Sequence, residues 1–534
     1  MTKPYLRIAA LAAVPLLLTA CGSGTADDGA SPAETGDKTL TAFLVEPTSL
    51  VPQMDTGTQV GMAMCANLME MNAETLELEP LVAESIDSDD NQHWTIKLKD
   101  WTFQDGTPVT ASSYVDAWNA TAYAPNALGG NGSMQPIQGY ADLNPADGST
   151  PKTKTLSGLK AVDDKTIEIT TTEPNGDLPM LLSSNPFCPL PESYYEDPEA
   201  YGQHPISNGP YEFESWDHNE QITLKKWDDF PGDEAAFGGG ADTFQFKIYT
   251  DIEAAYTDFV AGNLDLIRAP DGNMVERAKA DVGEQALFQD DRRHNHQFLA
   301  FPAYLDKYKD VNLRRAISQA IDREAIVSSV LKGHGQAADA IIPPEFETYR
   351  EGVCDACAFD PDAAKASLAK AEANGFDGSV KIIYSTSPAN DQVVEAISNQ
   401  LQTNLGIKVE IAPGLGPEVA EQRSGGTFDG IYFGGWGLSY ASEDQFLSQY
   451  VTHADGNDAN AYSNPEVDAL EAKALAAPDE AERAKNFQLV EDQVVRDLPV
   501  TPLYWKNVYG LQSEKAQTVS AKGDIQMYRA KYVG

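Results

Sequence analysis

The spacing of hydrophobic and polar positions changes repeatedly along this chain, which predicts a protein that mixes strands with helices. Short runs in which apolar and polar residues alternate, such as 94–98, predict half-buried strands, whereas apolar residues spaced as Leu313, Ile317 and Ile321 predict a helix. The strands expected on these grounds are 39–45, 94–98, 165–171, 211–216, 221–227, 243–249, 264–267, 380–384, 407–411 and 499–509. The helices expected are 58–72, a segment capped by Thr110, 252–261, two that begin near Val311 and Asp322, one that begins at Pro361, 392–405, and helical sequence over 465–497.

The segment 380–411 gives the clearest indication of fold class. A strand at 380–384 is followed by a helix at 392–405, which ends at Gly406, and by a second strand at 407–411. This strand–helix–strand order predicts a parallel pair with a right-handed crossover, and therefore an α/β protein.

A glycine-rich tryptophan segment is the strongest candidate for a functional surface. A buried strand is expected at 428–433, and it runs into Gly434-Gly435-Trp436-Gly437. Glycine allows backbone or ligand to approach without a β-carbon in the way, and tryptophan offers a large flat wall with one donor. We expect this segment to line a cleft. The alternative is a core tryptophan in a glycine-rich bend.

Length and charge limit the classes of function. The 534 residues are too many for one core, so two or three domains are expected. The formal net charge of -43 argues against a nucleic-acid partner and against electrostatic adhesion to anionic lipid.

The N-terminus resembles a bacterial lipoprotein signal. Lys3 and Arg7 precede an apolar run at 8–20, which ends in Leu18-Thr19-Ala20 directly before Cys21. We expect residues 1–20 to be removed as a signal peptide, Cys21 to be lipidated, and 21–37 to be a flexible linker. The alternative is an ordinary secretory signal with a coincidental cysteine. No later stretch is apolar enough to span a membrane, so a soluble body tethered by lipid to the extracytoplasmic face of the cell membrane is expected.

Four cysteines remain after Cys21, an even number that suits an oxidising compartment. Cys354 and Cys357 form a C-x-x-C, which occurs in redox motifs, in zinc sites and in local disulfides. A local structural disulfide is expected, because no second C-x-x-C and no strand-to-helix context accompany it. Cys65 and Cys188 are then expected to pair with each other.

Sequence signals for an enzyme are weak. The two S-x-x-K strings, 157–160 and 329–332, lack the K-T-G and S-D-N strings that accompany such a nucleophile, and no G-x-S-x-G, H-E-x-x-H or P-loop pattern occurs. His294 and His296 would face the same side of a strand, but a solvated pair is favoured over metal ligands. No catalytic residue, cofactor or metal is expected; a secreted hydrolase is the enzyme alternative.

Several segments together resemble the solute-binding proteins of ABC importers, in the oligopeptide- and dipeptide-binding class. The segments that carry the resemblance are FQDGTPVTASSYVDAW, ISNGPYEFESWDHNEQITLKKWDDFPG, DFVAGNLDLI, VNLRRAISQAIDREAIVSSVLKGHG, FDPDAAKASLAKAE and RSGGTFDGIYFGGW. The fourth is similar to a family signature, R-x-A-x-x-x-A-I-D-R-E, and is the most specific of them.

The resemblance implies two lobes of mixed α/β structure, a periplasmic-binding-protein-like fold with an additional inserted domain. Lobe 1 is expected in three pieces, 38–80, 201–290 and 499–534, with the inserted domain at 81–200 and lobe 2 at 291–498. The ligand is expected between the lobes of a monomer, which then docks on the transmembrane subunits of a permease. A signalling lipoprotein that presents its ligand to another receptor would share these features.

The resemblance also implies the ligand-binding residues. Glu46 matches an acidic residue after the first strand, Trp436 with Gly435 matches the family's G-W segment, and Arg423 matches an arginine upstream of it; Ser439 and Tyr440 complete the set. In peptide binders of the family, an aspartate at the position of Ser439 holds the ligand's α-ammonium, and a hydroxyl cannot replace that charge-assisted bond. Glu443 or Asp444 could take over this role. A peptide is the leading ligand, and an N-blocked peptide or a non-peptide solute is the alternative.

Overall fold

The computed structural model covers the whole chain and describes residues 38–54, 58–72, 77–232, 240–268, 270, 272–437, 442–451, 460–521 and 524–534. The signal peptide, Cys21 and the linker expected at 1–37 therefore lie outside the described residues. No helix in these ranges combines the length and the apolar character needed to cross a bilayer.

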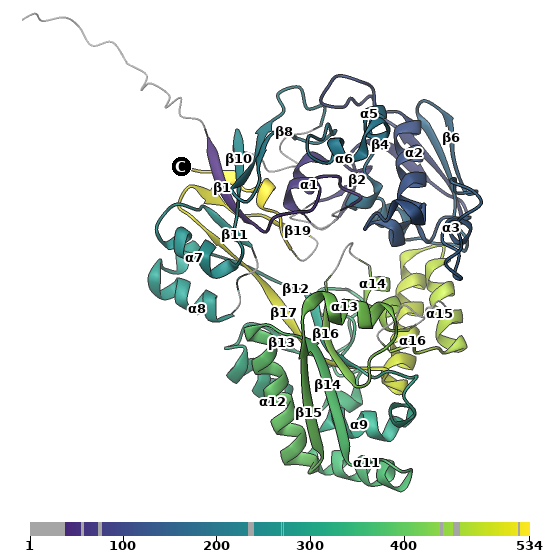
Figure 1. The fold of residues 1–534 in the computed structure, drawn as a ribbon. Coiled ribbons are helices and arrows are strands. Elements are labelled where there is room, and N and C mark those ends of the chain that lie inside the picture. The colour runs from purple at the N-terminus through teal and green to yellow at the C-terminus, as the bar shows by residue number, and fades with distance from the viewer. Residues whose placement is uncertain are drawn as a thin grey trace, which may run out of the picture. The chain divides into compact units, whose positions relative to one another are not determined.

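One mixed sheet of eleven strands organises residues 38–534 (Figure 1). Its order is β15-β14-β16-β12-β17-β11-β1-β10-β9-β8, and the short β13 pairs with β17. The strands are β1 Thr39–Leu44, β8 Tyr211–Asp217, β9 Gln221–Lys226, β10 Thr243–Ile248, β11 Leu266–Arg268, β12 Leu287–Ala300, β13 Gln336–Ala337, β14 Ser379–Ser385, β15 Lys408–Gly414, β16 Ile431–Gly437 and β17 Val500–Gln512.

Two long antiparallel strands, β12 and β17, join the two lobes. Their first pairings, from Leu287↔Leu511 to Asp290↔Val508, lie beside β11, and their last, from Asn295↔Lys506 to Ala300↔Val500, lie beside β16. The register is irregular between Asp290 and Asn295. The two lobes are therefore connected by a strand pair whose ladder is interrupted where it passes from one lobe to the other.

Lobe 1 surrounds the β1 end of the sheet with helices and small sheets. β1 pairs in parallel with both β10 and β11, as buried strands in α/β folds do. The helices here are α1 Gln59–Met64, α7 Ile252–Val260 and α8 Gly272–Asp281, and the small strands are β2 Met69–Met71, β3 Leu78–Pro80, β18 Ala516–Gln517, β19 Ser520–Ala521, β20 Asp524–Ile525 and β21 Lys531–Tyr532.

A separate four-stranded antiparallel sheet, in the order β4-β5-β7-β6, lies within residues 81–200. Its strands are β4 Ala83–Asp87, β5 His93–Leu98, β6 Leu159–Asp163 and β7 Thr166–Thr170; the helices of this segment are α2 Ala111–Ala122, α3 Tyr140–Leu143, α4 Leu178–Leu181, α5 Glu192–Glu196 and α6 Pro198–Tyr201. Thr110 begins α2 with a capping box, as expected from the sequence.

Lobe 2 has a hydrophobic core on each face of β14, β16 and β12. Ile382, Leu299 and Phe433 belong to one core, while their strand neighbours Ile383 and Phe298 belong to the other, as the alternation of side chains requires. The helices that cover these faces are α9 Val311–Gln319, α10 Arg323–Ala325, α11 Pro361–Ala373, α12 Pro388–Leu405, α13 Gly416–Ser424, α14 Asp444–Val451, α15 Pro465–Leu475 and α16 Glu480–Asp497.

The strand–helix–strand prediction for 380–411 is confirmed. β14 and β15 pair in parallel across seven positions, and α12 connects them. Gly406 ends α12 with a left-handed backbone (φ 71°), a conformation that glycine adopts without strain.

Two element predictions are wrong. The helix expected over 58–72 ends at Met64, because Cys65 is bonded to Cys188 and the Asn67 amide donates to the Ser183 carbonyl 3.1 Å away. The strand expected at 428–433 instead spans Ile431–Gly437, so the glycine-rich segment is itself β-strand.

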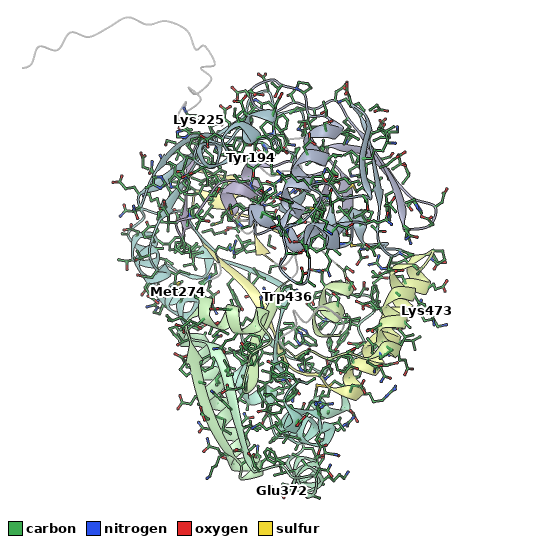
Figure 2. All side chains as sticks on the ribbon, turned by 45° about the vertical axis from the view of Figure 1, so that its right-hand side comes forward. Tyr194, Lys225, Met274, Glu372, Trp436 and Lys473 are labelled. Atoms are coloured by element: carbon green, nitrogen blue, oxygen red, sulfur yellow. A yellow bond between two sulfur atoms is a disulfide. The ribbon has the colours of Figure 1, made fainter. Side chains whose placement is uncertain are left out.

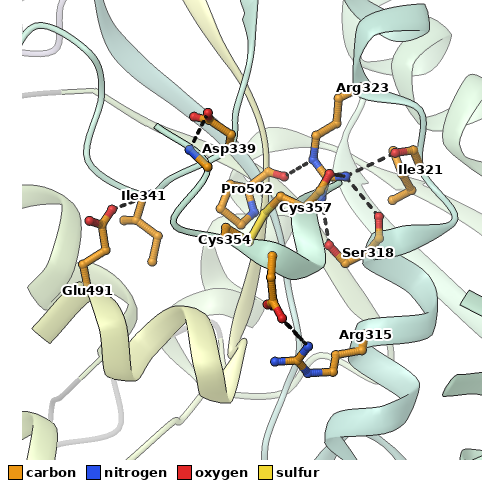
Figure 3. Close-up of a disulfide and its surroundings, with 12 residues drawn as sticks. Arg315, Ser318, Ile321, Arg323, Asp339, Ile341, Cys354, Cys357, Glu491 and Pro502 are labelled. Atoms are coloured by element: carbon orange, nitrogen blue, oxygen red, sulfur yellow. Dashed lines mark hydrogen bonds and ion pairs between the residues drawn. A yellow bond between two sulfur atoms is a disulfide. The ribbon is translucent and has the colours of Figure 1, made fainter. Parts of the chain in front are cut away.

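Both disulfides have the expected connectivity, Cys65–Cys188 and Cys354–Cys357. The second lies beside Arg323, the arginine of the A-I-D-R-E string (Figure 3). The buried Arg323 guanidinium donates to the carbonyls of Pro502 (2.7 Å) and Cys357 (2.6 Å), to two carbonyls at the end of α9, and to the Ser318 hydroxyl. Burial lowers the pKa of Arg323 to about 9, so the group stays charged at neutral pH. This one side chain fixes α9, the disulfide loop and the lobe 2 end of β17 to each other.

Replacement of Arg323 by alanine should lower the free energy of unfolding by about 3–5 kcal/mol, because several buried carbonyls lose a charged donor at once. Urea unfolding followed by far-UV circular dichroism measures the change. Arg315 is the matched control, since its ion pair with Asp355 is exposed (3.2 Å); Arg315→Ala should cost less than about 1 kcal/mol. Equal losses in the two variants would contradict this assignment.

Candidate ligand-binding site

The glycines of β16 make room for amide side chains of β12. β16 pairs antiparallel with β12, so that Gly435 faces Gln297 and Gly437 faces Asn295. A β-carbon at Gly435 would lie 1.8 Å from Nε2 of Gln297, and one at Gly437 would lie 2.7 Å from Oδ1 of Asn295. Both glycines therefore allow a polar side chain to lie directly over the β16 backbone.

Trp436 lies between these glycines, in the middle of the molecule in Figure 2. Because side chains alternate along a strand, it points to the face opposite Gln297 and Asn295. It is partly buried and packs against the core that contains Phe298 and Tyr432. Its indole Nε1 is buried and has no hydrogen-bond partner in the described part of the chain. Buried N–H groups are almost always paired, so this donor is available to a ligand acceptor.

Arg423 reaches the same face of β16 from the last turn of α13. Its guanidinium is hydrogen-bonded to the hydroxyl of Tyr432, which precedes Trp436 by four residues. Burial raises the pKa of Tyr432, and the charge and the hydrogen bond of Arg423 oppose that shift. Tyr432 in turn stacks on Phe428, with ring centroids 4.8 Å apart. Arg423 is therefore held against the hydrophobic core on which Trp436 also packs.

Glu46 follows β1 and is held by the β8–β9 hairpin. Its carboxylate accepts hydrogen bonds from Trp216 Nε1 and from the Asn219 backbone, each at 2.9 Å, and its Oε1 lies 2.9 Å from His218 Nδ1. The side chain is 30% exposed. In this structure Glu46 fixes the hairpin to the end of β1, and its exposed fraction leaves it accessible to a ligand.

The structure does not describe Ser439 and Tyr440, which lie in the gap at 438–441. Glu443, one of the two carboxylates considered as a substitute for the missing aspartate, accepts a hydrogen bond from the Thr348 hydroxyl at 2.9 Å. Burial raises the pKa of Glu443. Glu443 is therefore engaged within lobe 2.

A cavity of about 640 Å³ lies elsewhere in lobe 2, beside the Cys354–Cys357 disulfide. None of the predicted ligand-binding residues lines it. Within the described ranges, no group of three or more His, Cys, Asp or Glu side chains is placed to hold a metal ion.

Comparison with known proteins settles the family. The model of the bacterial extracellular solute-binding proteins, family 5, matches residues 77–458. The chain belongs to this family. The family description places its members outside the cytoplasm, in agreement with the N-terminal pattern.

Relatives of this family-5 chain match most of its length. The dipeptide-binding protein DppE of Bacillus subtilis is 26% identical over 89% of this chain and 88% of its own, and the oligopeptide-binding protein OppA of the same species is 23% identical over 99% of both. Among solved structures, the murein tripeptide binding protein MppA of Escherichia coli has a TM-score of 0.77 at 21% identity, over 94% of this chain and 99% of that one. The structural likeness confirms the two-lobed α/β fold.

Sequence reasoning missed a buried ion pair that joins the inserted segment to lobe 2 of this family-5 protein. Arg483 of α16 pairs with Asp177, the residue before α4, and the Ser442 hydroxyl donates to the same carboxylate. The Arg483 side chain is 9% exposed and the Asp177 side chain is 2% exposed. Two further hydrogen bonds join the same two parts of the chain. The Gly176 N–H donates to the Leu475 carbonyl at 2.8 Å, and the Asn91 side-chain amide donates to the Ala477 carbonyl at 3.0 Å.

We call this the Asp177–Arg483 contact. Its third member, Ser442, directly follows the segment 438–441, which contains Ser439 and which the structure does not describe. Burial raises the pKa of Asp177 to about 6, and the charge of Arg483 opposes that shift. Because the two partners are about 300 residues apart along the sequence, no local pattern could have predicted the contact.

The Asp177–Arg483 contact should behave as a coupled buried pair. A double-mutant cycle of Asp177→Asn and Arg483→Met, read by urea unfolding, should give a coupling energy of about 1–3 kcal/mol, since each single change leaves the other group buried without its partner. The exposed pair Lys160–Glu168, 3.5 Å apart, is the control and should couple by less than about 1 kcal/mol. A coupling energy equal to that of the control pair would show that the Asp177–Arg483 pair does not stabilise the contact between the inserted segment and lobe 2.

Proposed function

We propose that this protein captures a peptide between its two lobes and delivers it to the transmembrane subunits of an ABC importer. Family membership supports the proposal, as do the relatives, which are named for binding dipeptides, oligopeptides and a murein tripeptide. The observation that carries it is the position of Trp436 at the end of β16, next to the strands that pass between the lobes; its indole Nε1 has no hydrogen-bond partner among the described residues.

The proposed capture requires no bond to be made or broken. A peptide that contacts both lobes binds the closed arrangement better than an open one, and this difference in affinity shifts the population toward closure. In this proposal, the Asp177–Arg483 contact is one of the contacts that form when the lobes close on the ligand. The permease recognises the closed form.

Lipid attachment at Cys21 belongs to the same proposal. Residues 18–21 carry the processing pattern, and the linker at 22–37 would allow the body to reach a permease in the same membrane. One acyl-modified cysteine then keeps the protein at the cell surface, in spite of a net charge that anionic lipid repels.

We propose that this protein recognises the N-terminus of its ligand differently from the peptide binders that use an aspartate. Ser439 offers a neutral hydroxyl where those proteins present a carboxylate, and a hydrogen bond to a charged group contributes about 1.5–3 kcal/mol. We therefore propose that a free α-ammonium contributes less to affinity here, so that N-blocked peptides are accepted together with free ones.

Mass spectrometry of the ligand released by denaturing the purified full chain tests the proposal directly. The expected result is a set of short peptides of mixed sequence, in which free and blocked N-termini both occur. The variant Ser439→Asp should shift that set toward free N-termini by about tenfold or more, the equivalent of one charge-assisted bond.

A single non-peptide compound released from both proteins would contradict the peptide assignment while leaving the capture mechanism intact. If the purified protein released no ligand and bound no added peptide, the result would contradict the proposed function itself. Tyr195→Phe, a change on an exposed side chain of α5 in the inserted segment, is the control and should leave the released set unchanged.

A further inference from the structure

The Asp177–Arg483 contact brings carboxylates from two parts of the chain to the same guanidinium. Asp177 precedes α4 in the inserted segment and pairs with Arg483 of α16. The carboxylates of Glu443 and Asp444, at the beginning of α14 in lobe 2, also act on the charge of Arg483. Glu480, in the first turn of α16, acts on it too but is exposed. Of these described groups, the four that are not exposed are three carboxylates and one guanidinium.

Water is largely excluded from this contact. The side chains of Asp177 and Arg483 are 2% and 9% exposed, and Ser442 and Glu443 are buried. The Ser442 hydroxyl lies between the paired charges: it donates to the Asp177 carboxylate and accepts from Nη2 of Arg483 at 3.1 Å. Carboxylates remain ionised away from water only where positive charge and hydrogen bonds compensate them. One guanidinium balances one carboxylate, so the contact holds an excess of negative charge when every acid is ionised.

The pKa values of the buried acids agree with this charge balance. Burial raises the pKa of Asp177 from its ordinary value of 3.8 to about 6; the charge of Arg483 opposes the shift, and that of Asp444 adds to it. Burial also raises the pKa of Glu443, and the charge of Asp177 contributes to that shift. The Asp177 carboxylate is buried against lobe 2, where its partners Arg483 and Ser442 lie. Its raised pKa therefore depends on the contact between the inserted segment and lobe 2.

We propose that closure of the lobes takes up a proton from solvent at the Asp177–Arg483 contact, so that the protein binds its peptide more tightly as the pH falls. The proposal rests on the proposed function, in which this contact forms when the lobes close on a ligand. With the lobes apart, the Asp177 carboxylate is in water and is ionised at neutral pH. Closure removes that water, and the added proton neutralises one of the excess carboxylates. Reopening returns the proton to solvent.

The two protonation equilibria of Asp177 give the direction and the size of this effect. A carboxylate whose pKa is higher in the closed form binds more protons in that form, so closure becomes more favourable as the pH falls through the higher value. For Asp177 this range extends from about pH 7 down to about pH 4, where the open form is protonated as well. The two pKa values, 3.8 and about 6, correspond to a peptide affinity about tenfold higher at pH 5 than at pH 7.

Isothermal titration calorimetry on ligand-stripped full chain tests the proposal, with alanine peptides of two to five residues as the probes. Titrations at pH 6 in two buffers of different ionisation enthalpy give the number of protons taken up per peptide bound. About half a proton is expected, because at this pH Asp177 is about half protonated in the closed form and ionised in the open form. Neither terminus of a peptide titrates appreciably at pH 6. The dissociation constant should also fall about tenfold between pH 7 and pH 5.

Variants separate proton uptake from a merely structural contact. Asp177→Asn should abolish the uptake and flatten the pH dependence, because its side chain no longer titrates. Arg483→Met should move the midpoint of the pH dependence upward, because it removes the charge that opposes protonation of Asp177. A structural role alone would weaken binding equally at every pH and move no midpoint. Asp142→Asn, a change on an exposed side chain of α3 in the inserted segment, is the control and should leave both the uptake and the midpoint unchanged.

Three outcomes would overturn the proposal in protein that binds the peptides. They are binding without proton uptake at pH 6, an uptake that persists in Asp177→Asn, and weaker binding by the wild type as the pH falls. The measurement on the wild type decides the proposal even where a variant does not fold. All three outcomes leave the peptide-binding function standing. Failure of every alanine peptide to bind the wild type at either pH would instead count against the proposed function, on which this inference depends.

Discussion

The pairing of β12 with β17 is the constraint on which the rest of the structure depends. These two strands are shared by both lobes, and their register is irregular at two places, between Asp290 and Asn295 and between Gln297 and Phe298. The first of these lies between the pairings beside β11 and those beside β16. Each half of the pair is fixed by its own lobe, through β11 on one side and β16 on the other. In the proposed closure, rotation at the irregularity between Asp290 and Asn295 changes the relation between the lobes and leaves each core intact.

The features of the candidate site are arranged around this strand pair. Arg323 fixes the lobe 2 end of β17 through the Pro502 carbonyl, and the glycines of β16 make room for β12 side chains. Arg323, the arginine of the A-I-D-R-E string, therefore has a structural role, because its guanidinium is bonded to β17 and to neighbouring groups of the protein. In the proposed function, a ligand bound beside β16 lies next to the irregularity between Asp290 and Asn295.

Much of the fold could be predicted from local sequence patterns. The capped helix after Thr110 and the strand–helix–strand unit at 380–411 follow from the periodicity and end signals of their own residues. Long-range constraints could not be predicted in this way. The polar run at 290–296 did not predict a strand, although β12 passes through it. β16 extends to Gly437 through its pairing with β12, in which its glycines leave room for Gln297 and Asn295. The Asp177–Arg483 contact likewise depends on partners that are distant in sequence.

The central claim is that the two lobes close on a ligand by rotation at the β12–β17 irregularity between Asp290 and Asn295. The most direct measurement is the distance between spin labels on Lys160→Cys and Lys370→Cys, one in each lobe; both sites are exposed, and the four cysteines in the described ranges are disulfide-bonded. Double electron–electron resonance on ligand-stripped protein should give a broad distribution, which narrows and shifts when an enzymatic casein digest is added. An identical distribution with and without peptides, in protein shown to bind them, would contradict closure at this hinge.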